Sequence, residues 1–71
     1  MFNKTQCFLV FDNGVTILRV IGDPHEIRDY IEDSDTKTIE IQVTNEKGED
    51  PQTCWIRLKN IMCVQEVVEN E

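Results

Sequence analysis

The sequence has 71 residues, with seven Lys and Arg residues against fourteen Asp and Glu residues, so its net charge is −7. A chain of this length buries roughly 60% of the surface that its unfolded form exposes, which allows one small core and excludes a two-domain enzyme. The longest apolar run, Cys7 to Phe11, has five residues, far short of the ~20 that cross a bilayer as a helix. Neither a membrane span nor a signal peptide is expected, and the sequence predicts a single cytoplasmic domain over residues 1–71.

The first predicted element is a β-hairpin formed by residues 6–12 and 15–21. Both segments are rich in β-branched and aromatic residues, and only Asn13 and Gly14 separate them. Asn-Gly between two such segments is the strongest short signal for a hairpin, because a type I′ turn needs a positive φ at both central residues. The sequence therefore predicts a hairpin closed by a two-residue type I′ turn.

Both faces of this hairpin are largely apolar. The turn sets Cys7 opposite Val20 and Leu9 opposite Leu18, and this face is expected to form the core. The other face carries Phe8, Val10, Ile17 and Arg19. An antiparallel sheet with one solvated face normally alternates apolar and polar residues. We therefore expect a helix, another strand or a second subunit to cover the second face.

A short amphipathic helix is predicted over residues 24–33. Asp23 can cap its N-terminus, Pro24 suits the first helical position, and Glu26 follows three residues after the cap. One side of the helix is apolar and consists of Ile27, Tyr30 and Ile31. The opposite side, which we call the acidic stripe, consists of Glu26, Asp29, Glu32 and Asp33. The apolar side is expected to pack on the sheet, which leaves the acidic stripe to solvent or to a partner.

Three further strands are predicted in the second half of the chain. Residues 38–44 alternate apolar and polar side chains most clearly, and residues 45–52 are polar apart from one Gly and one Pro, which predicts an exposed, flexible loop. Strands follow at residues 53–58 and 61–67, and residues 68–71 are expected to form a frayed acidic tail. The predicted fold is α+β, in the order β-β-α-β-β-β, with a small, strongly bent antiparallel sheet or open barrel closed by one helix.

The stretch 55–61 resembles the second Sm motif, in which a strand ends in Ile-Arg-Gly-x-Asn-Ile and bends into the last strand. Arg57, Asn60 and Ile61 have the matching spacing, with Leu58 in place of the glycine. The resemblance covers seven residues and implies a bent strand pair just before Ile61. The negative net charge does not fit RNA binding, and direct binding to nucleic acid is not expected.

Residues suited to catalysis or metal binding are sparse in this chain. The single histidine, His25, lies on the predicted solvated first turn of the helix, and the sequence contains no common hydrolase, metalloprotease or nucleotide-binding motif. Cys7, Cys54 and Cys63 lack a CxxC pair and are expected to be buried thiols, with a Cys7–Cys54 disulfide possible only if their strands are neighbours. We expect neither enzymatic activity nor a metal or cofactor.

The acidic composition favours a protein partner with a basic surface. A strongly acidic domain is attracted to basic grooves that otherwise hold nucleic acid, so the sequence predicts a small protein-binding module that acts as an acidic inhibitor or regulator. Such modules occur among phage and bacterial accessory proteins. In this interpretation the acidic stripe binds the partner. A purely solubilising role of the acidic residues remains open at this stage.

The apolar second face of the hairpin favours self-association. The predicted association surface consists of Phe8, Val10, Ile17, Arg19, Trp55 and Arg57, an aromatic and arginine composition typical of interfaces. Trp55 is predicted on the outer face of its strand, where it is either covered by a second layer or exposed. The alternative function is a symmetric homo-oligomer that holds a small anionic ligand at its subunit junctions. The candidate contacts for that ligand are Arg19, Arg28, Arg57 and Lys59.

Overall fold

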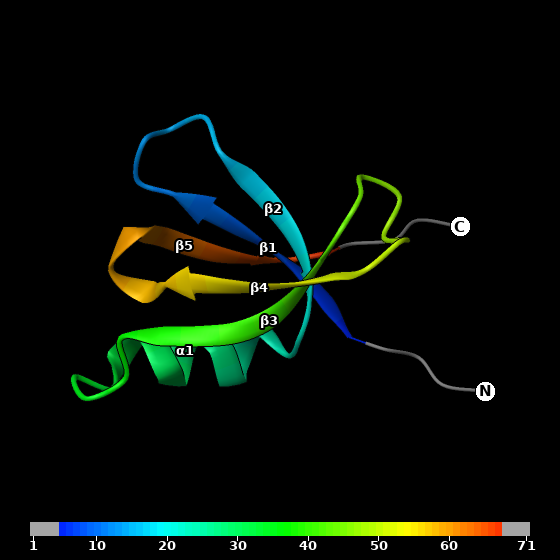
Figure 1. The fold of residues 1–71 in the computed structure, drawn as a ribbon. Helices are drawn as coiled ribbons and strands as arrows, with labels where there is room; N and C mark the ends of the chain where they lie inside the picture. The colour runs from blue at the N-terminus through cyan, green and yellow to red at the C-terminus, as the bar shows by residue number, and fades with distance from the viewer. Residues whose placement is uncertain (1–4, 68–71) are drawn as a thin grey trace.

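The computed structural model describes residues 5–67, which form one five-stranded antiparallel sheet and one α-helix (Figure 1). In chain order the elements are β1 (Gln6–Phe11), β2 (Ile17–Ile21), α1 (Pro24–Glu32), β3 (Thr38–Thr44), β4 (Gln52–Arg57), the 3₁₀ turn η1 (Leu58–Asn60) and β5 (Ile61–Glu66). The strands lie in the order β4-β3-β2-β1-β5, and every neighbouring pair is antiparallel. The predicted tail at residues 68–71 lies outside the described residues.

The predicted α+β fold, its element order and its short helix are confirmed. Observed element bounds differ from the predicted ones by at most two residues, which is the usual uncertainty at the ends of elements, and those of β3 are the same. β4 and β5 are the two edges of the sheet and are not hydrogen-bonded neighbours, so the sheet is not closed. The predicted strong bend or open barrel is not confirmed.

The register of the first hairpin is as predicted. Cys7 pairs with Val20 and Leu9 with Leu18. Cys7, Leu9 and Val20 are completely buried, so this face of the hairpin forms the centre of the core. A one-residue slip would turn all of these side chains to the other face, which explains why the apolar pattern specifies the register.

The turn of this hairpin differs from the predicted type I′ turn. Among the described residues 12–16, only Gly14 has a positive φ, at 80°. The side-chain oxygen of Asn13 instead accepts hydrogen bonds from the backbone N–H groups of Val15 and Thr16, each at 2.9 Å. The predicted turn type is wrong, because only one residue of the turn has a positive φ. The Asn13 side chain instead accepts from the backbone N–H groups just before β2.

The core continues from the hairpin into β3, β4 and the 3₁₀ turn. Its buried side chains come from the sheet, α1 and η1, and they are Cys7, Leu9, Val20, Ile27, Ile41, Ile56, Leu58 and Ile61. Seven further side chains are partly buried against it: Phe11, Leu18, Ile31, Ile39, Val43, Cys54 and Val64. The predicted alternation of β3 and β4 is confirmed, because every second residue of these strands joins the core.

The helix begins as predicted but buries a narrower face. The Asp23 carboxylate accepts a hydrogen bond from the His25 backbone N–H at 3.0 Å, which confirms the N-cap. α1 packs against β5 and η1, and Ile27 is buried, whereas Tyr30 is 46% exposed. The prediction that Tyr30 packs on the core is wrong, because packing over β5 and η1 leaves its side of the helix in solvent.

Three residues of η1 lead the chain directly from β4 at one edge of the sheet to β5 at the other. The backbone N–H of Leu58 donates to the carbonyl of Lys37 at 3.0 Å, and the carbonyl of Asn60 accepts from the N–H of Asp12 at 2.8 Å. These bonds attach the turn to the start of β3 and to the end of β1. The bend between the last two strands, which the resemblance to the Sm motif implies, is present.

The loop between β3 and β4 carries an internal hydrogen-bond network. The Asn45 side-chain oxygen accepts from the N–H groups of Lys47 and Glu49, both at 2.9 Å. The Gly48 carbonyl accepts from the Gln6 side chain at 3.1 Å, which ties the loop to β1. The predicted flexibility of this loop stays a prediction, and the network shows which contacts oppose it.

The hairpin turn gives a first testable prediction. Replacing Gly14 with Val should lower the free energy of unfolding by about 1 kcal/mol or more, because a β-branched residue is strained at a positive φ. Urea denaturation followed by circular dichroism measures the change. Val15→Ala is the matched control, since Val15 is 81% exposed and its truncation should change stability by no more than about 0.5 kcal/mol. Equal stability of Gly14→Val and the parent protein would contradict this turn.

Candidate functional site

The acidic stripe lies on the exposed side of α1. Glu26, Asp29 and Glu32 are all exposed, and Glu32 pairs with Arg28 one helical turn earlier at 3.3 Å. Both side chains of this pair are more than 60% exposed, and such surface pairs contribute at most about 1 kcal/mol. The three carboxylates are therefore available to a partner at little cost in stability.

Asp33, the fourth predicted member of the acidic stripe, has a structural role at the end of the helix. One oxygen of its carboxylate accepts from the backbone N–H of Asp35 and the other from the Thr36 hydroxyl, both at 3.0 Å. Its own N–H closes the last turn of α1. Asp33 therefore stabilises the link from α1 to β3, and the surface-directed part of the acidic stripe is formed by the other three residues.

Four residues of the predicted association surface come together on the outer face of β1 and β2, which is the face opposite the core. Phe8 pairs with Arg19 and Val10 with Ile17, and we call these four residues the hairpin patch. Ile17 is 59% exposed. The guanidinium carbon of Arg19 lies 5.7 Å from the centre of the Phe8 ring, a cation–π distance. No helix covers this patch within the described residues, because α1 packs against β5 and η1.

Arg19 also connects the hairpin patch to the loop at residues 45–51. Its Nε donates to the Gln6 side-chain oxygen at 2.6 Å, and its Nη1 donates to the Glu46 carbonyl at 3.1 Å. Gly48 has a φ of 83°, and a side chain there would lie within 3.0 Å of both Gln6 and Arg19. The loop can therefore approach this arginine closely only because a glycine stands at the contact.

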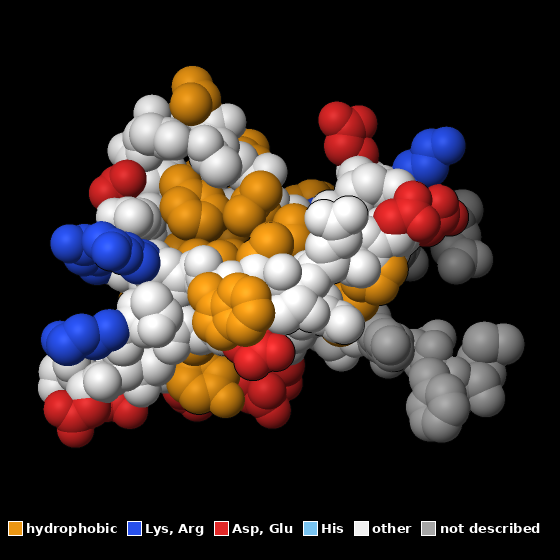
Figure 2. All heavy atoms as spheres, in the orientation of Figure 1, with side chains coloured by type: hydrophobic (Ala, Val, Ile, Leu, Met, Phe, Trp, Pro, Cys, Tyr) orange, Lys and Arg blue, Asp and Glu red, His pale blue; other side chains and the backbone are white. Residues whose placement is uncertain are grey.

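Trp55 and Arg57 lie on the outer face of β4, away from the hairpin patch. Trp55 pairs with Glu40 of β3, and Arg57 pairs with Thr38 of the same strand. β3 lies between β4 and β2 in the sheet. Trp55 is 71% exposed, which settles the open question of its burial. The six predicted association residues thus form two groups rather than one continuous surface. Figure 2 shows hydrophobic side chains over the hairpin and over β4.

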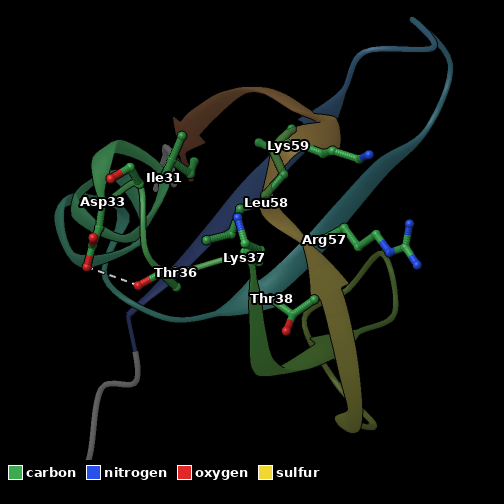
Figure 3. Close-up of a pocket in the computed structure, with 10 residues that line it drawn as sticks. Ile31, Asp33, Thr36, Lys37, Thr38, Arg57, Leu58 and Lys59 are labelled. Carbon is green, nitrogen blue, oxygen red and sulfur yellow. Dashed lines mark hydrogen bonds between the residues drawn. The ribbon is translucent and has the colours of Figure 1, made fainter.

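A basic pocket lies at the end of the sheet where η1 joins β4 to β5. Its volume is about 620 Å³, and it lies between the end of α1, the start of β3 and η1. Three of the seven Lys and Arg residues of the chain line it, namely Lys37, Arg57 and Lys59. In Figure 3, Lys37 extends toward Leu58, while Arg57 and Lys59 extend to the side away from α1.

The pocket changes the predicted set of anion contacts. Arg57 and Lys59 both line this pocket, whereas Arg19 lies on the outer face of β2 and Arg28 on α1 beside β5. Lys37 was missed by the sequence reasoning. Its position directly before the alternating strand 38–44 was a usable signal, but only the pairing of β3 with β4 places it beside Leu58, in the lining of the same pocket as Arg57 and Lys59.

The thiols offer little chemistry. Burial, and secondarily the negative charge of Asp23, raises the pKa of the Cys7 thiol to about 11, so this group stays protonated at neutral pH and is a poor nucleophile. Cys54 and Cys63 are partly buried, and all three cysteines are free. β2 and β3 separate the strands of Cys7 and Cys54, so a disulfide between them would require rearrangement of the sheet.

Within residues 5–67, no three His, Cys, Asp or Glu side chains lie close enough together to hold a metal ion. No helix in the same part of the chain is long and apolar enough to span a membrane.

Comparisons with protein-family models, with curated proteins and with solved structures found no match to the chain. The acidic stripe, the two apolar groups and the basic pocket are therefore the features of the molecule that can indicate a function.

The state of the Cys7 thiol gives a second prediction. In the folded protein at pH 8, a maleimide should label Cys54 and Cys63 well before Cys7, and all three should react in urea; peptide mass spectrometry measures the labelling. The unfolded thiol ionises near pH 9 and the native one near pH 11. The stability that Cys7 contributes is therefore present below pH 9 and is lost as the pH rises toward 11. Equal labelling rates of Cys7 and Cys54 in the folded protein would contradict its burial.

Proposed function

We propose that the protein is a small, non-catalytic protein-binding module whose acidic stripe engages a basic surface of another protein. One observation carries the proposal. Glu26, Asp29 and Glu32 are exposed on one side of α1, while Ile27 and Ile31 on the other side pack on the core. The folding of the helix therefore does not consume these carboxylates, and they lie on a rigid element that can present them together.

The charge of the whole chain supports an inhibitory or regulatory role. A net charge of −7 on 71 residues produces a field that repels phosphate backbones and attracts positively charged clefts, which raises association rates at low salt. A module that fills a basic groove excludes the nucleic acid or acidic substrate that the groove normally holds. This is the mode of action expected of an acidic accessory protein of phage or bacterial type.

The third prediction tests the acidic stripe by charge reversal. Asp29→Lys together with Glu32→Lys adds four charges and changes the net charge from −7 to −3. Capture of a basic partner from source-cell lysate should weaken severalfold, mainly through a slower association rate, and the loss should shrink at high salt. Stability should change by no more than about 0.5 kcal/mol.

The matched control places the same charge change elsewhere. Glu46→Lys together with Glu49→Lys also gives −3, and both side chains are exposed in the loop between β3 and β4. Partner capture, identified by mass spectrometry over a salt series, should persist in this control. Equal loss of capture in both double variants would show that net charge alone matters. Equal retention would reject the acidic stripe as the binding site.

A second candidate function is a symmetric homo-oligomer that binds a small anionic ligand. The exposure of Ile17 and Trp55, which are 59% and 71% accessible, favours it, because large exposed apolar side chains are typical of association surfaces. In this case the hairpin patch or the outer face of β4 would lie between subunits.

The fourth prediction tests self-association. If the hairpin patch forms a subunit interface, Ile17→Glu should convert the oligomer into a folded monomer, since a charge at the centre of an apolar interface is costly to desolvate. Light scattering at tens of micromolar, on the order of the dissociation constants of weak complexes, measures the mass. Val15→Glu is the control with the same charge change on the hairpin tip. A parent protein that is already monomeric at this concentration would reject the oligomer.

A further inference from the structure

The free edge of β4 is open to a further strand. β4 lies at one edge of the sheet, where β3 is its neighbour, whereas β5 at the other edge has α1 packed against it. β4 pairs with β3 in one continuous register from Gln52 to Arg57, and residues 52–56 include no charged side chain. Natural edge strands are commonly blunted by bulges or charges. Residues 52–56 have neither, so this edge can accept another strand.

The register with β3 determines which backbone groups face the open edge. The Leu58 N–H donates to the Lys37 carbonyl at 3.0 Å, and these two residues stand opposite each other, one step beyond the end of the β3–β4 ladder. Opposite residues in an antiparallel ladder alternate between hydrogen-bonded and non-hydrogen-bonded pairs. Thr53, Trp55 and Arg57 therefore occupy non-hydrogen-bonded pairs with β3. Their backbone N–H and C=O groups point away from β3, to the open edge.

The same three residues carry exposed side chains. Thr53, Trp55 and Arg57 are all exposed, and Trp55 is 71% accessible. The alternate residue Ile56 is buried in the core. Tryptophan and arginine are enriched among the residues that dominate binding energy at interfaces. A strand added here would gain backbone hydrogen bonds and contact with Trp55 together.

The charges around β4 differ between its two ends. Glu49 and Asp50 precede the strand, whereas Arg57 ends it and Lys59 follows in η1, and all four side chains are exposed. In Figure 3, Arg57 and Lys59 extend to the same side, away from α1. If two copies of β4 pair antiparallel, the basic end of each lies beside the acidic start of the other, and two-fold symmetry makes this contact twice. The charges therefore favour a second copy of this strand as the occupant of the edge.

One register suits two identical strands best. With the two-fold axis at Trp55, this residue lies opposite its own copy and Arg57 lies opposite the partner's Thr53. Only strand residues then face one another. An axis one residue earlier would place Arg57 opposite the partner's Pro51, which has no N–H to donate. An axis one residue later would extend the ladder into η1, where the strand has ended.

We propose that β4 pairs antiparallel with β4 of a second copy of this chain, with the two-fold axis at Trp55, so that the two sheets become one continuous sheet. Arg57 is then the diagonal neighbour of the partner's Trp55, within reach of a cation–π contact. This interface presupposes the second candidate function, the homo-oligomer, and assigns it to the β4 edge rather than to the hairpin patch.

Proline substitution tests the backbone pairing. Sedimentation equilibrium at tens of micromolar, on the order of the dissociation constants of weak complexes, should give the mass of a dimer for the parent protein. Thr53→Pro removes an N–H that faces the edge but no bond to β3, and it should weaken dimerisation by about tenfold or more. The matched control Thr53→Ala keeps this N–H and should dimerise as the parent does. Equal dimerisation of the two variants, both folded by circular dichroism, would overturn the proposal.

A charge exchange tests the antiparallel two-fold arrangement without the proline. One variant carries Arg57→Glu with Lys59→Glu, and the other carries Glu49→Lys with Asp50→Asn, because asparagine tolerates the positive φ of 57° at this position. Each variant alone places like charges together and should dimerise about tenfold more weakly or worse. An equimolar mixture should restore the dimer, because the altered end of one chain meets the altered start of the other. Failure of the mixture to associate would overturn the arrangement.

Ile17→Glu distinguishes the β4 edge from the hairpin patch. The dimer should persist in this variant. Its loss there, with retention in Thr53→Pro, would move the interface to the hairpin patch and overturn the proposal while the homo-oligomer stands. A mass above that of a dimer would indicate head-to-tail pairing of β4 with another edge and would overturn two-fold pairing. A monomeric parent protein would overturn both the β4 interface and the homo-oligomer, and would leave the edge to an extended segment of a different protein.

Discussion

The structure depends on the short connection between the two edges of the sheet. β4 and β5 lie at opposite edges, and only the three residues of η1 join them. The backbone bonds of Leu58 to Lys37 and of Asn60 to Asp12 hold this connection. It buries Leu58 and Ile61 at one end of the core, gives α1 a surface to pack on, and places three cations around one pocket.

The same connection gathers basic residues, together with Asp33, around one pocket of an otherwise acidic chain. The basic side chains of the pocket lie at the η1 end, and the carboxylates of α1 lie along the opposite side of the helix from the core. A protein with a net charge of −7 thus carries exposed carboxylates along one side of α1 and a local group of basic residues near η1.

The outer face of the sheet differs between the hairpin and β4. At the hairpin, Arg19 covers part of Phe8 and binds the neighbouring loop, so much of the apolar surface there is already partnered within the chain. At β4, Trp55 stands exposed beside Glu40. Because exposed tryptophan is a common centre of interfaces, Trp55 and the exposed Ile17 are the apolar members of the predicted association surface that are most open to a partner.

The sequence by itself determined the local features: the hairpin register from its apolar pairs, the helix start from Asp23 and Pro24, and the strand faces from their alternation. These depend on interactions between residues close along the chain or on a period of two. Only the tertiary structure decided that Asn13 supports the turn with its side chain, that Tyr30 and Trp55 are exposed, and that Lys37 lies beside Leu58. Each of these outcomes depends on which strands pair and on where α1 and η1 dock, and such long-range packing leaves no periodic signal in the sequence.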